Sequence, residues 1–314
     1  MTVQSYQLSF FRWASLALLA VSMLISPVIR AHAQTQASCQ FTTFNIRFNL
    51  NNGGTLDLIP QGVNDYRSVV GSAYNDVDFS VKGFTRSAGG GISYYQHGSS
   101  DTSFTDRSNS GVTLGVYGSS TALASASGTP FTIQGSTVTP LTMTINGKTY
   151  SKFTVWGTNR WGSIVGSFAD SSGKMHAFKR SGNGSAIQLD YPGAAHTVAS
   201  AINDNGTIVG FYSKTASPNL WRHGFIYNNG RWATVNYPDS TLQTELSGIS
   251  NANLITATTI RGSNALNSFI YVNGTFKKMV MPNSSNPTYA YGVSPNNGFI
   301  TGFSGFKGYV ASCK

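Results

Sequence analysis

The sequence predicts an all-β protein, a β-propeller of six four-stranded blades. Residues 201–239 contain three short runs of β-branched and aromatic residues, separated by turns rich in Asn, Asp and Gly. The same pattern recurs along the chain, and no stretch beyond residue 33 has the sustained period of a helix. One such unit cannot bury both faces of its own sheet, so we expect it to stack on copies of itself.

The best-preserved unit contains four strand-like runs. Asn, Asp and Gly at 203–206 tolerate the backbone conformation of a tight turn. Tyr237-Pro238 ends the unit, because proline cannot donate to a strand ladder. The strands are expected at residues 197–202, 207–212, 223–227 and 231–236. The segments 141–145 and 149–156, which flank Asn146-Gly147, are predicted to form a separate hairpin.

A small residue after an apolar run marks each copy of the unit. These residues are Gly71, Gly115, Gly166, Gly210, Ala257 and Gly302. They lie 44, 51, 44, 47 and 45 residues apart, which is typical of a four-stranded blade.

The N-terminal segment can supply the strand that the last unit lacks. The last unit stops after its strand at 308–312, whereas residues 40–45 match the final strand of the best unit, 231–236. Joining the ends leaves 45 steps between Gly302 and Gly71, one further period. We therefore expect the N-terminal strand to close the last blade and remove an exposed sheet edge.

Two cysteines, Cys39 and Cys313, stand at these ends. An even pair in an oxidising compartment usually bonds, so a disulfide is predicted. The alternative is a lipid-modified Cys39, but residues 36–38 lack the apolar residue of such sites, and Cys313 would be left without a partner.

The N-terminus has the pattern of a secretory signal. Arg12 precedes an apolar run at 14–25, and Ala31-His32-Ala33 is an A-x-A cleavage site. This predicts a signal peptide over residues 1–33 and a single propeller domain over 34–314, periplasmic or extracellular and without a transmembrane segment. An uncleaved membrane anchor is the alternative.

The repeat resembles a known family. Ile202–Gly206 followed by Ile208-Val209-Gly210, the triplet His176-Ala177-Phe178, and Asp190-Tyr191-Pro192-Gly193 are similar to the bacterial HAF extracellular repeats. The resemblance is strongest in the third and fourth units, weakest in the second, and departs at Ala257 in the fifth. It implies a secreted, propeller-like protein and supplies no catalytic residues.

Charged residues make up only 10% of the chain. Without Arg12 and Arg30 of the signal, 19 basic and 11 acidic residues remain, a net charge of +8. Basic residues gathered on one face would attract anionic polymers. For an exported protein this indicates acidic polysaccharide or another envelope component, with no nucleic acid, no cofactor and a monomeric state expected.

Three residues are candidates for binding. Trp161 lies inside a turn, and Trp221 ends a loop beside Arg222. Aromatic side chains exposed at such places can stack on sugar rings.

Other chemistry-bearing residues have structural explanations. His176 and His223 begin equivalent strands, and Lys82, Asn267 and Lys307 fill the same position in other units. A position shared by every unit usually serves the blade, here by hydrogen-bonding a neighbouring turn. No metal-ligand spacing and no catalytic motif is found, so neither a metal nor a catalytic site is predicted.

Three hypotheses of function remain open. The first is a secreted binding or scaffold module for glycans, acidic ones in particular. The second is an extracytoplasmic hydrolase or lyase acting on carbohydrate, and the third is a purely structural envelope protein. A carboxylate cluster found in one unit only would favour the second.

Overall fold

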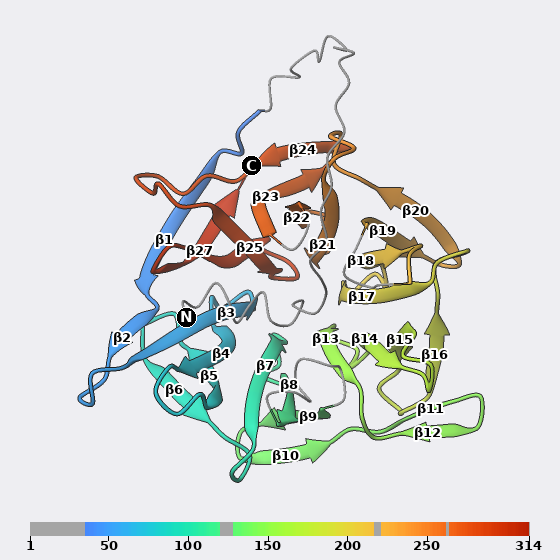
Figure 1. The fold of residues 1–314 in the computed structure, drawn as a ribbon, viewed down its shortest axis with the longest axis horizontal. Coiled ribbons are helices and arrows are strands. Elements are labelled where there is room, and N and C mark those ends of the chain that lie inside the picture. Colours follow the sequence, from blue (N-terminus) through green and yellow to red (C-terminus); the bar gives the residue numbers. More distant parts are fainter. Residues whose placement is uncertain (1–34, 120–127, 217–220, 262–263, 314) are drawn as a thin grey trace, which may run out of the picture.

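The structure, a computed structural model, describes residues 35–119, 128–216, 221–261 and 264–313. These residues form strands and no helix. Six sheets surround a central axis in the order of the sequence (Figure 1). The predicted six-bladed β-propeller is confirmed. The predicted signal peptide, residues 1–33, lies outside the described residues.

Each blade is an antiparallel meander that runs from the axis outwards. Blade 1 has β3 (Thr55–Val63), β4 (Val69–Asn75), β5 (Val81–Arg86) and β6 (Ile92–Tyr95), with β2 (Arg47–Asn49) paired to the start of β3. Blade 2 has β7 (Asp101–Arg107), β8 (Thr113–Gly118), β9 (Thr129–Gln134) and β10 (Thr137–Pro140). Blade 3 has β13 (Thr154–Thr158), β14 (Ile164–Ala169), β15 (Met175–Arg180) and β16 (Ala186–Leu189).

The second half of the ring repeats this order. Blade 4 has β17 (His196–Ile202), β18 (Ile208–Ser213), β19 (Arg222–Asn228) and β20 (Arg231–Val235), close to the predicted boundaries. Blade 5 has β21 (Gln243–Ile249), β22 (Ile255–Arg261), β23 (Asn264–Val272) and β24 (Thr275–Lys278). Blade 6 has β25 (Thr288–Val293), β26 (Phe299–Ser304), β27 (Lys307–Cys313) and, outermost, β1 (Cys39–Asn45).

The small residue of each repeat lies opposite an aromatic residue. Gly71 pairs with Phe84 on the next strand, and an ideal Cβ on Gly71 would lie 2.8 Å from that ring. The pairing recurs in the other blades as Gly115–Phe131, Gly166–Phe178, Gly210–Phe225, Ala257–Phe269 and Gly302–Tyr309. All six aromatic side chains are buried. The sequence keeps a small residue here because the space of a side chain is taken by the neighbouring ring and, closer still to an ideal Cβ on Gly71, by the carbonyl of Ile59 on the inner strand.

The innermost strands have a β-bulge at one matching place, where the register of β3, for example, shifts between Pro60 and Gly62. The residue at this place is Gly62, Asp106, Gly157, Ala201, Gly248 or Gly292. An ideal Cβ on Gly157 would lie 2.8 Å from the Cα of Ala201 in the next blade. The blades therefore approach each other backbone to backbone around the axis. Among these six residues, only Asp106 has a side chain larger than a methyl group.

The N-terminal strand closes the ring, as predicted. β1 is paired antiparallel with β27, from Cys39 opposite Cys313 to Asn45 opposite Lys307 (Figure 1). The disulfide Cys39–Cys313 is present. Phe41 packs edge-on against Tyr309, with ring centroids 5.0 Å apart. The outer edge of blade 6 is thereby covered by the other end of the chain.

The residues before β1 also hold blade 5. The backbone N–H of Ala37 donates to the carbonyl of Lys278 at 2.9 Å, and the N–H of Lys278 donates to Thr35 at 3.2 Å. Ala37 is buried. The N-terminal segment therefore spans the outer strands of two blades.

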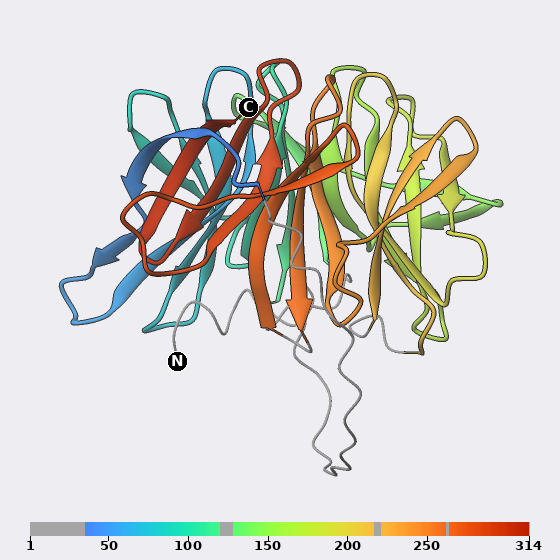
Figure 2. The ribbon, with the colours of Figure 1, turned by 90° about the horizontal axis from the view of Figure 1, so that it is seen from above.

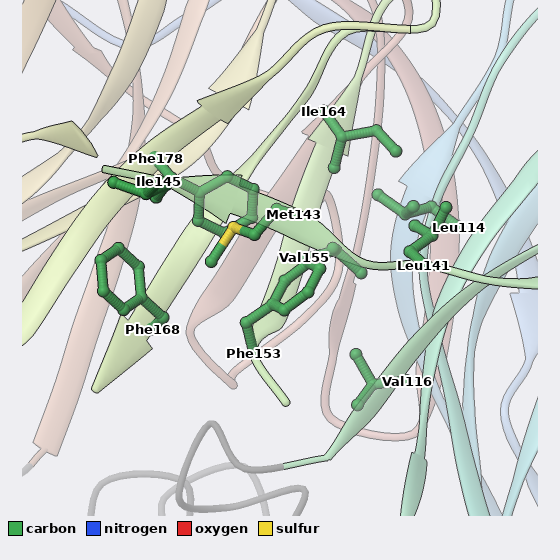
Figure 3. Packing of buried hydrophobic residues seen from close by; sticks show 10 residues of the cluster. All are labelled: Leu114, Val116, Leu141, Met143, Ile145, Phe153, Val155, Ile164, Phe168 and Phe178. Carbon is green, nitrogen blue, oxygen red and sulfur yellow. The ribbon is translucent and has the colours of Figure 1, made fainter. Parts of the chain in front are cut away.

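Apolar side chains fill the spaces between blades. Figure 3 shows the cluster between blades 2 and 3, where β11 (Met143–Ile145) and β12 (Lys148–Tyr150) cover the interface with Met143 and Ile145.

The predicted hairpin was too long, because its second strand does not run through to residue 156. Phe153 is fully buried, and the chain bends at 151–153 to place it there, so 154–158 joins blade 3 as β13.

Among the described residues, no helix long and apolar enough to cross a membrane is present.

Opening the ring closure should destabilise the whole protein. A Cys39→Ala, Cys313→Ala variant frees the unfolded chain from a constraint over 274 residues and should lose about 2–4 kcal/mol of unfolding free energy. Urea unfolding of both proteins measures the difference. Equal midpoints would contradict a role of this bond in closure.

Candidate functional site

The two ends of the propeller differ in their connections. Turns joining the first strand to the second, and the third to the fourth, lie at one end, which we call the turn face. Connections from the second strand to the third, and from blade to blade, lie at the other end, the loop face. The turn face is the upper one in Figure 2, where β27 ends.

Asn or Ser begins each inner turn of the turn face. Asn203 Oδ1 accepts hydrogen bonds from the backbone of Asn205 and Thr207, and its Nδ2 donates to the carbonyl of Ser250 in the next blade. Asn64 and Asn159 do the same. The repeated Asn therefore shapes its own turn and ties it to the neighbouring blade.

The following turn residues link the blades into what we call the turn belt, made of Asp65, Asn109, Arg160, Asp204, Asn251 and Asn296. Asn109 donates to Asp65, Asn296 donates to Asp65, Asn251 donates to Asn296 and to Asp204, and the backbone of Arg160 donates to Asp204. Burial opposes the charge of Asp65, but the backbone of Asn297 and the side chains around it hold its pKa below the ordinary value. The turn aspartates are therefore structural.

Blades 2 and 3 are linked by Asp106, which lies on the innermost strand β7 and is not part of the turn belt. Asp106 Oδ2 accepts from the backbone N–H of Thr158 at 2.9 Å, and Oδ1 from that of Arg107 at 2.8 Å. Burial raises the pKa of Asp106 to about 6, and the two backbone bonds only partly offset this. A single titratable carboxyl thus joins these two blades near the axis.

Trp161 is on the turn face. Its side chain is 61% exposed, its indole N–H donates to the carbonyl of Asp204 at 3.0 Å, and the guanidinium of Arg160 lies 4.2 Å from its ring centroid. One face of the indole is therefore covered by Arg160.

A small pocket opens on the loop face between blades 4 and 5. Its volume is about 110 Å³. The lining residues are Trp221, Arg222, His223, Asn236, Tyr237, Ser240, Leu242 and Gln243. They come from Trp221 and the first residues of β19, the loop after β20 and the start of β21, so the stacking of two blades creates the pocket.

Trp221 stands at this pocket with a strained backbone. Its side chain is 58% exposed and its φ is 55°, in the left-handed region that a bulky residue rarely adopts. Such a conformation costs about 1–3 kcal/mol and persists only where the surroundings impose it. Trp221 therefore presents a large apolar ring to solvent beside the pocket.

Arg222 lines the same pocket but its side chain is buried, although the sequence places it beside a loop as a candidate binding residue. Its guanidinium forms an ion pair with Glu245 and lies 5.1 Å from the centroid of Phe211. Burial raises the pKa of Glu245, and Arg222 opposes that rise. The pair joins blades 4 and 5 beneath the pocket.

The structure therefore separates the three candidate binding residues. Trp221 and Arg222 share the loop-face pocket, whereas Trp161 is in the turn between β13 and β14 on the opposite face, where its indole bonds the turn before β18. The residues that complete the pocket, such as Asn236 and Ser240, come from the connection between blades. Their proximity depends on blade stacking, and no local sequence pattern marks it.

The two repeat histidines bond to neighbouring segments of their own blades. His176 lies 2.8 Å from Asp190 and 3.2 Å from Asp170, which bracket its strand in sequence. The Nδ1 of His223 lies 3.0 Å from the amide nitrogen of Asn236. Hydrogen bonds, first among them that of Ser172, hold the pKa of Asp170 far below its ordinary value. The described residues contain no group of three or more His, Cys, Asp or Glu side chains able to hold a metal.

Comparison with known proteins identifies the fold. No family profile and no curated protein matches the sequence. A solved structure assigned to the gluconolactonases aligns over 90% of this chain and 94% of its own, with a TM-score of 0.52 and 12% identity. At that identity it supports the propeller fold alone.

Two other alignments are looser. Virginiamycin B lyase from Staphylococcus aureus aligns over 88% of this chain and 99% of its own, with a TM-score of 0.47 and 11% identity. AofleA from Arthrobotrys oligospora aligns over 85% and 83%, with a TM-score of 0.48 and 9% identity. Neither likeness is close enough to bear on the function of this chain.

Removing the Asp106 carboxyl should change how stability depends on pH. The folded pKa of about 6 exceeds the unfolded value of about 3.9, so ionisation costs stability as pH rises between these values. The wild type should lose about 1–3 kcal/mol over this range relative to Asp106→Asn. Thermal or urea unfolding of both proteins from pH 4 to pH 7 measures the difference, and parallel curves would refute it.

Loss of the His176 side chain should destabilise blade 3. His176→Ala removes contacts to two carboxylates and should lower the unfolding free energy by about 1–3 kcal/mol. Thermal unfolding tests this. An unchanged melting temperature, together with loss of a binding activity, would instead assign His176 to a functional site.

Proposed function

We propose that the protein is an exported binding propeller of the HAF-repeat kind, which holds a carbohydrate in the loop-face pocket. The observation that carries this proposal is Trp221, an exposed indole held at positive φ at the pocket. The six blades supply a rigid scaffold, and the pocket is built where two of them meet.

The pocket offers what a sugar ring requires. A sugar presents an apolar C–H face, which stacks on an aromatic ring, and hydroxyl groups, which need hydrogen-bond partners. Trp221 provides the ring, and His223, Asn236, Ser240 and Gln243 bring polar side chains to the same lining. His223 and Asn236 already contact each other, which fixes their orientation.

The ion pair between Arg222 and Glu245 favours a neutral sugar over an acidic one in this pocket. Glu245 pairs with the guanidinium and Phe211 lies beside it, so a ligand carboxylate would compete with an existing buried partner. None of the described lining residues is Asp or Glu. We therefore propose contacts to hydroxyl groups in this pocket, in place of the acidic glycan expected from the net charge of the chain.

Export is proposed on two grounds. The disulfide Cys39–Cys313 is of the kind that persists in oxidising compartments. The N-terminal 33 residues have the charge, apolar run and A-x-A site of a signal peptide.

N-terminal sequencing of protein recovered from outside the cytoplasm should begin at Gln34, and a start at Met1 would refute cleavage.

Replacing Trp221 should weaken glycan binding. Trp221→Ala should lose about tenfold in affinity for a neutral glycan that the wild type selects on a glycan array, because the stacking contact is lost. Trp161→Ala is the matched control, since Trp161 is similarly exposed and lies on the other face. Calorimetric titration of the three proteins measures the affinities.

Three results would contradict the proposal. Equal losses in both variants would remove the pocket from the explanation, and no binding to any glycan would favour a purely structural envelope protein. Consumption of the selected glycan by the wild type would assign the pocket to a hydrolase or lyase instead.

A further inference from the structure

Arginines are concentrated on the turn face of the propeller. The ends of the strands and turns at this face carry Arg67, Arg86, Arg107, Arg160, Arg180 and Arg231. The loop face carries basic and acidic side chains in nearly equal number: Lys82, Lys152, Lys174, Lys214, Lys278, Lys307, Arg47, Arg222 and Arg261, beside Asp57, Asp76, Asp78, Asp101, Asp170, Asp190, Asp239 and Glu245. The excess positive charge is therefore concentrated at one end of the molecule, on guanidinium groups.

The carboxylates of the turn face do not neutralise these arginines. Asp65 and Asp204 accept hydrogen bonds from the turn belt, and Asp106 accepts two from backbone amides. In the described residues, the only ion pair between these groups is a long contact of 3.9 Å from Arg160 to Asp204. The carboxylates of this face thus serve mainly to hold the inner turns and strands of neighbouring blades together.

Three of the arginines are partly withdrawn from water without a counter-ion. Burial lowers the pKa of Arg86, Arg107 and Arg180, and no opposing charge contributes. The Nε of Arg107 is buried and has no hydrogen-bond partner. A partly desolvated cation costs free energy, which an approaching anion would recover.

The guanidinium groups are held in fixed positions. Arg86 and Arg180 end the third strand of blades 1 and 3, and each donates through Nη1 to the carbonyl of the next residue, at 3.2 and 3.3 Å. The Arg86 guanidinium also lies 4.3 Å from the ring centroid of Phe44, and Arg180 Nε donates to Thr142 at 2.8 Å. Fixed guanidinium planes are well suited to bind oxyanions.

We propose that the turn face of blades 1 to 3 binds an acidic polysaccharide through Arg86, Arg107 and Arg180. Their distribution over three successive blades matches a chain with repeated oxyanions better than one small anion. The ring beside Arg86 favours a polysaccharide over nucleic acid. Phe44 packs against the core and has the Arg86 guanidinium 4.3 Å from its ring centroid, whereas single-stranded nucleic acid binds by stacking its bases on open rings. This site is separate from the loop-face pocket and does not depend on the function proposed for it.

The test compares two variants with the same loss of charge. Arg86→Gln, Arg180→Gln removes two guanidiniums from the turn face, and Lys82→Gln, Lys174→Gln removes two ammonium groups from the loop face. The probes are polygalacturonate for carboxylates and dextran sulfate for sulfates, with unmodified dextran as the uncharged reference. Binding is measured at low and at physiological salt, and thermal unfolding confirms that each variant is folded.

The wild type should bind at least one acidic polymer more tightly than dextran, and this binding should weaken as salt rises. The arginine variant should bind about fivefold more weakly, and the lysine variant should stay within about twofold of the wild type. Polygalacturonate and dextran sulfate report whether carboxylates or sulfates are preferred. If the arginine variant does not fold, Arg86→Lys, Arg180→Lys replaces it and should bind with intermediate affinity, because it keeps the charge and loses the planar donors.

Equal weakening in the arginine and lysine variants would overturn the proposal, because net charge alone would then explain binding. No binding to either acidic polymer at low salt would also overturn it. Tighter binding to single-stranded DNA than to both polysaccharides would assign the arginines to a different partner.

Discussion

The contact between the repeat glycine and the aromatic ring of the adjacent strand determines how each blade is built. Gly71, for example, leaves space for Phe84, and a Cβ there would also collide with the inner strand. The ring can then lie within the blade and bury its surface against the next one. The same pair recurs in all six blades, with Ala257 in place of glycine in blade 5, so each blade can pack on the next in the same way around the ring.

The turn belt and the ion pair Arg222–Glu245 act at different levels of this ring. The belt consists of short side chains that bond the inner turns of neighbouring blades, and it recurs because every blade has such a turn. The ion pair occurs at one junction only, between blades 4 and 5. Repeated contacts therefore build the ring, and the contacts that differ from blade to blade, such as those of Asp106 and Trp221, give it individual chemical sites.

The sequence was sufficient to predict the six blades, the closing strand and the disulfide, because each depends on period, strand pattern or position in the chain. The bend at Phe153 was missed, since a buried aromatic interrupting a β-like run looks like the continuation of a strand. The burial of Arg222 was missed because Glu245 is 23 residues away and meets it only when blades stack. The concentration of arginines on one face depends on which strand ends share that face, and this becomes visible only once the blades are placed in space.

Closure by the first strand has a consequence for how the protein is made. β1 pairs with β27, and the paired residues Cys39 and Cys313 are 274 residues apart, so the outermost strand of blade 6 has no partner until every strand between them has been made. Until then both the waiting strand and the unfilled gap in the ring present open sheet edges, which are prone to pair with other chains. A product cut short by a single blade would keep five correct repeats and still lack a closed structure. The six repeats thus share one design, but all of them are needed to close the ring.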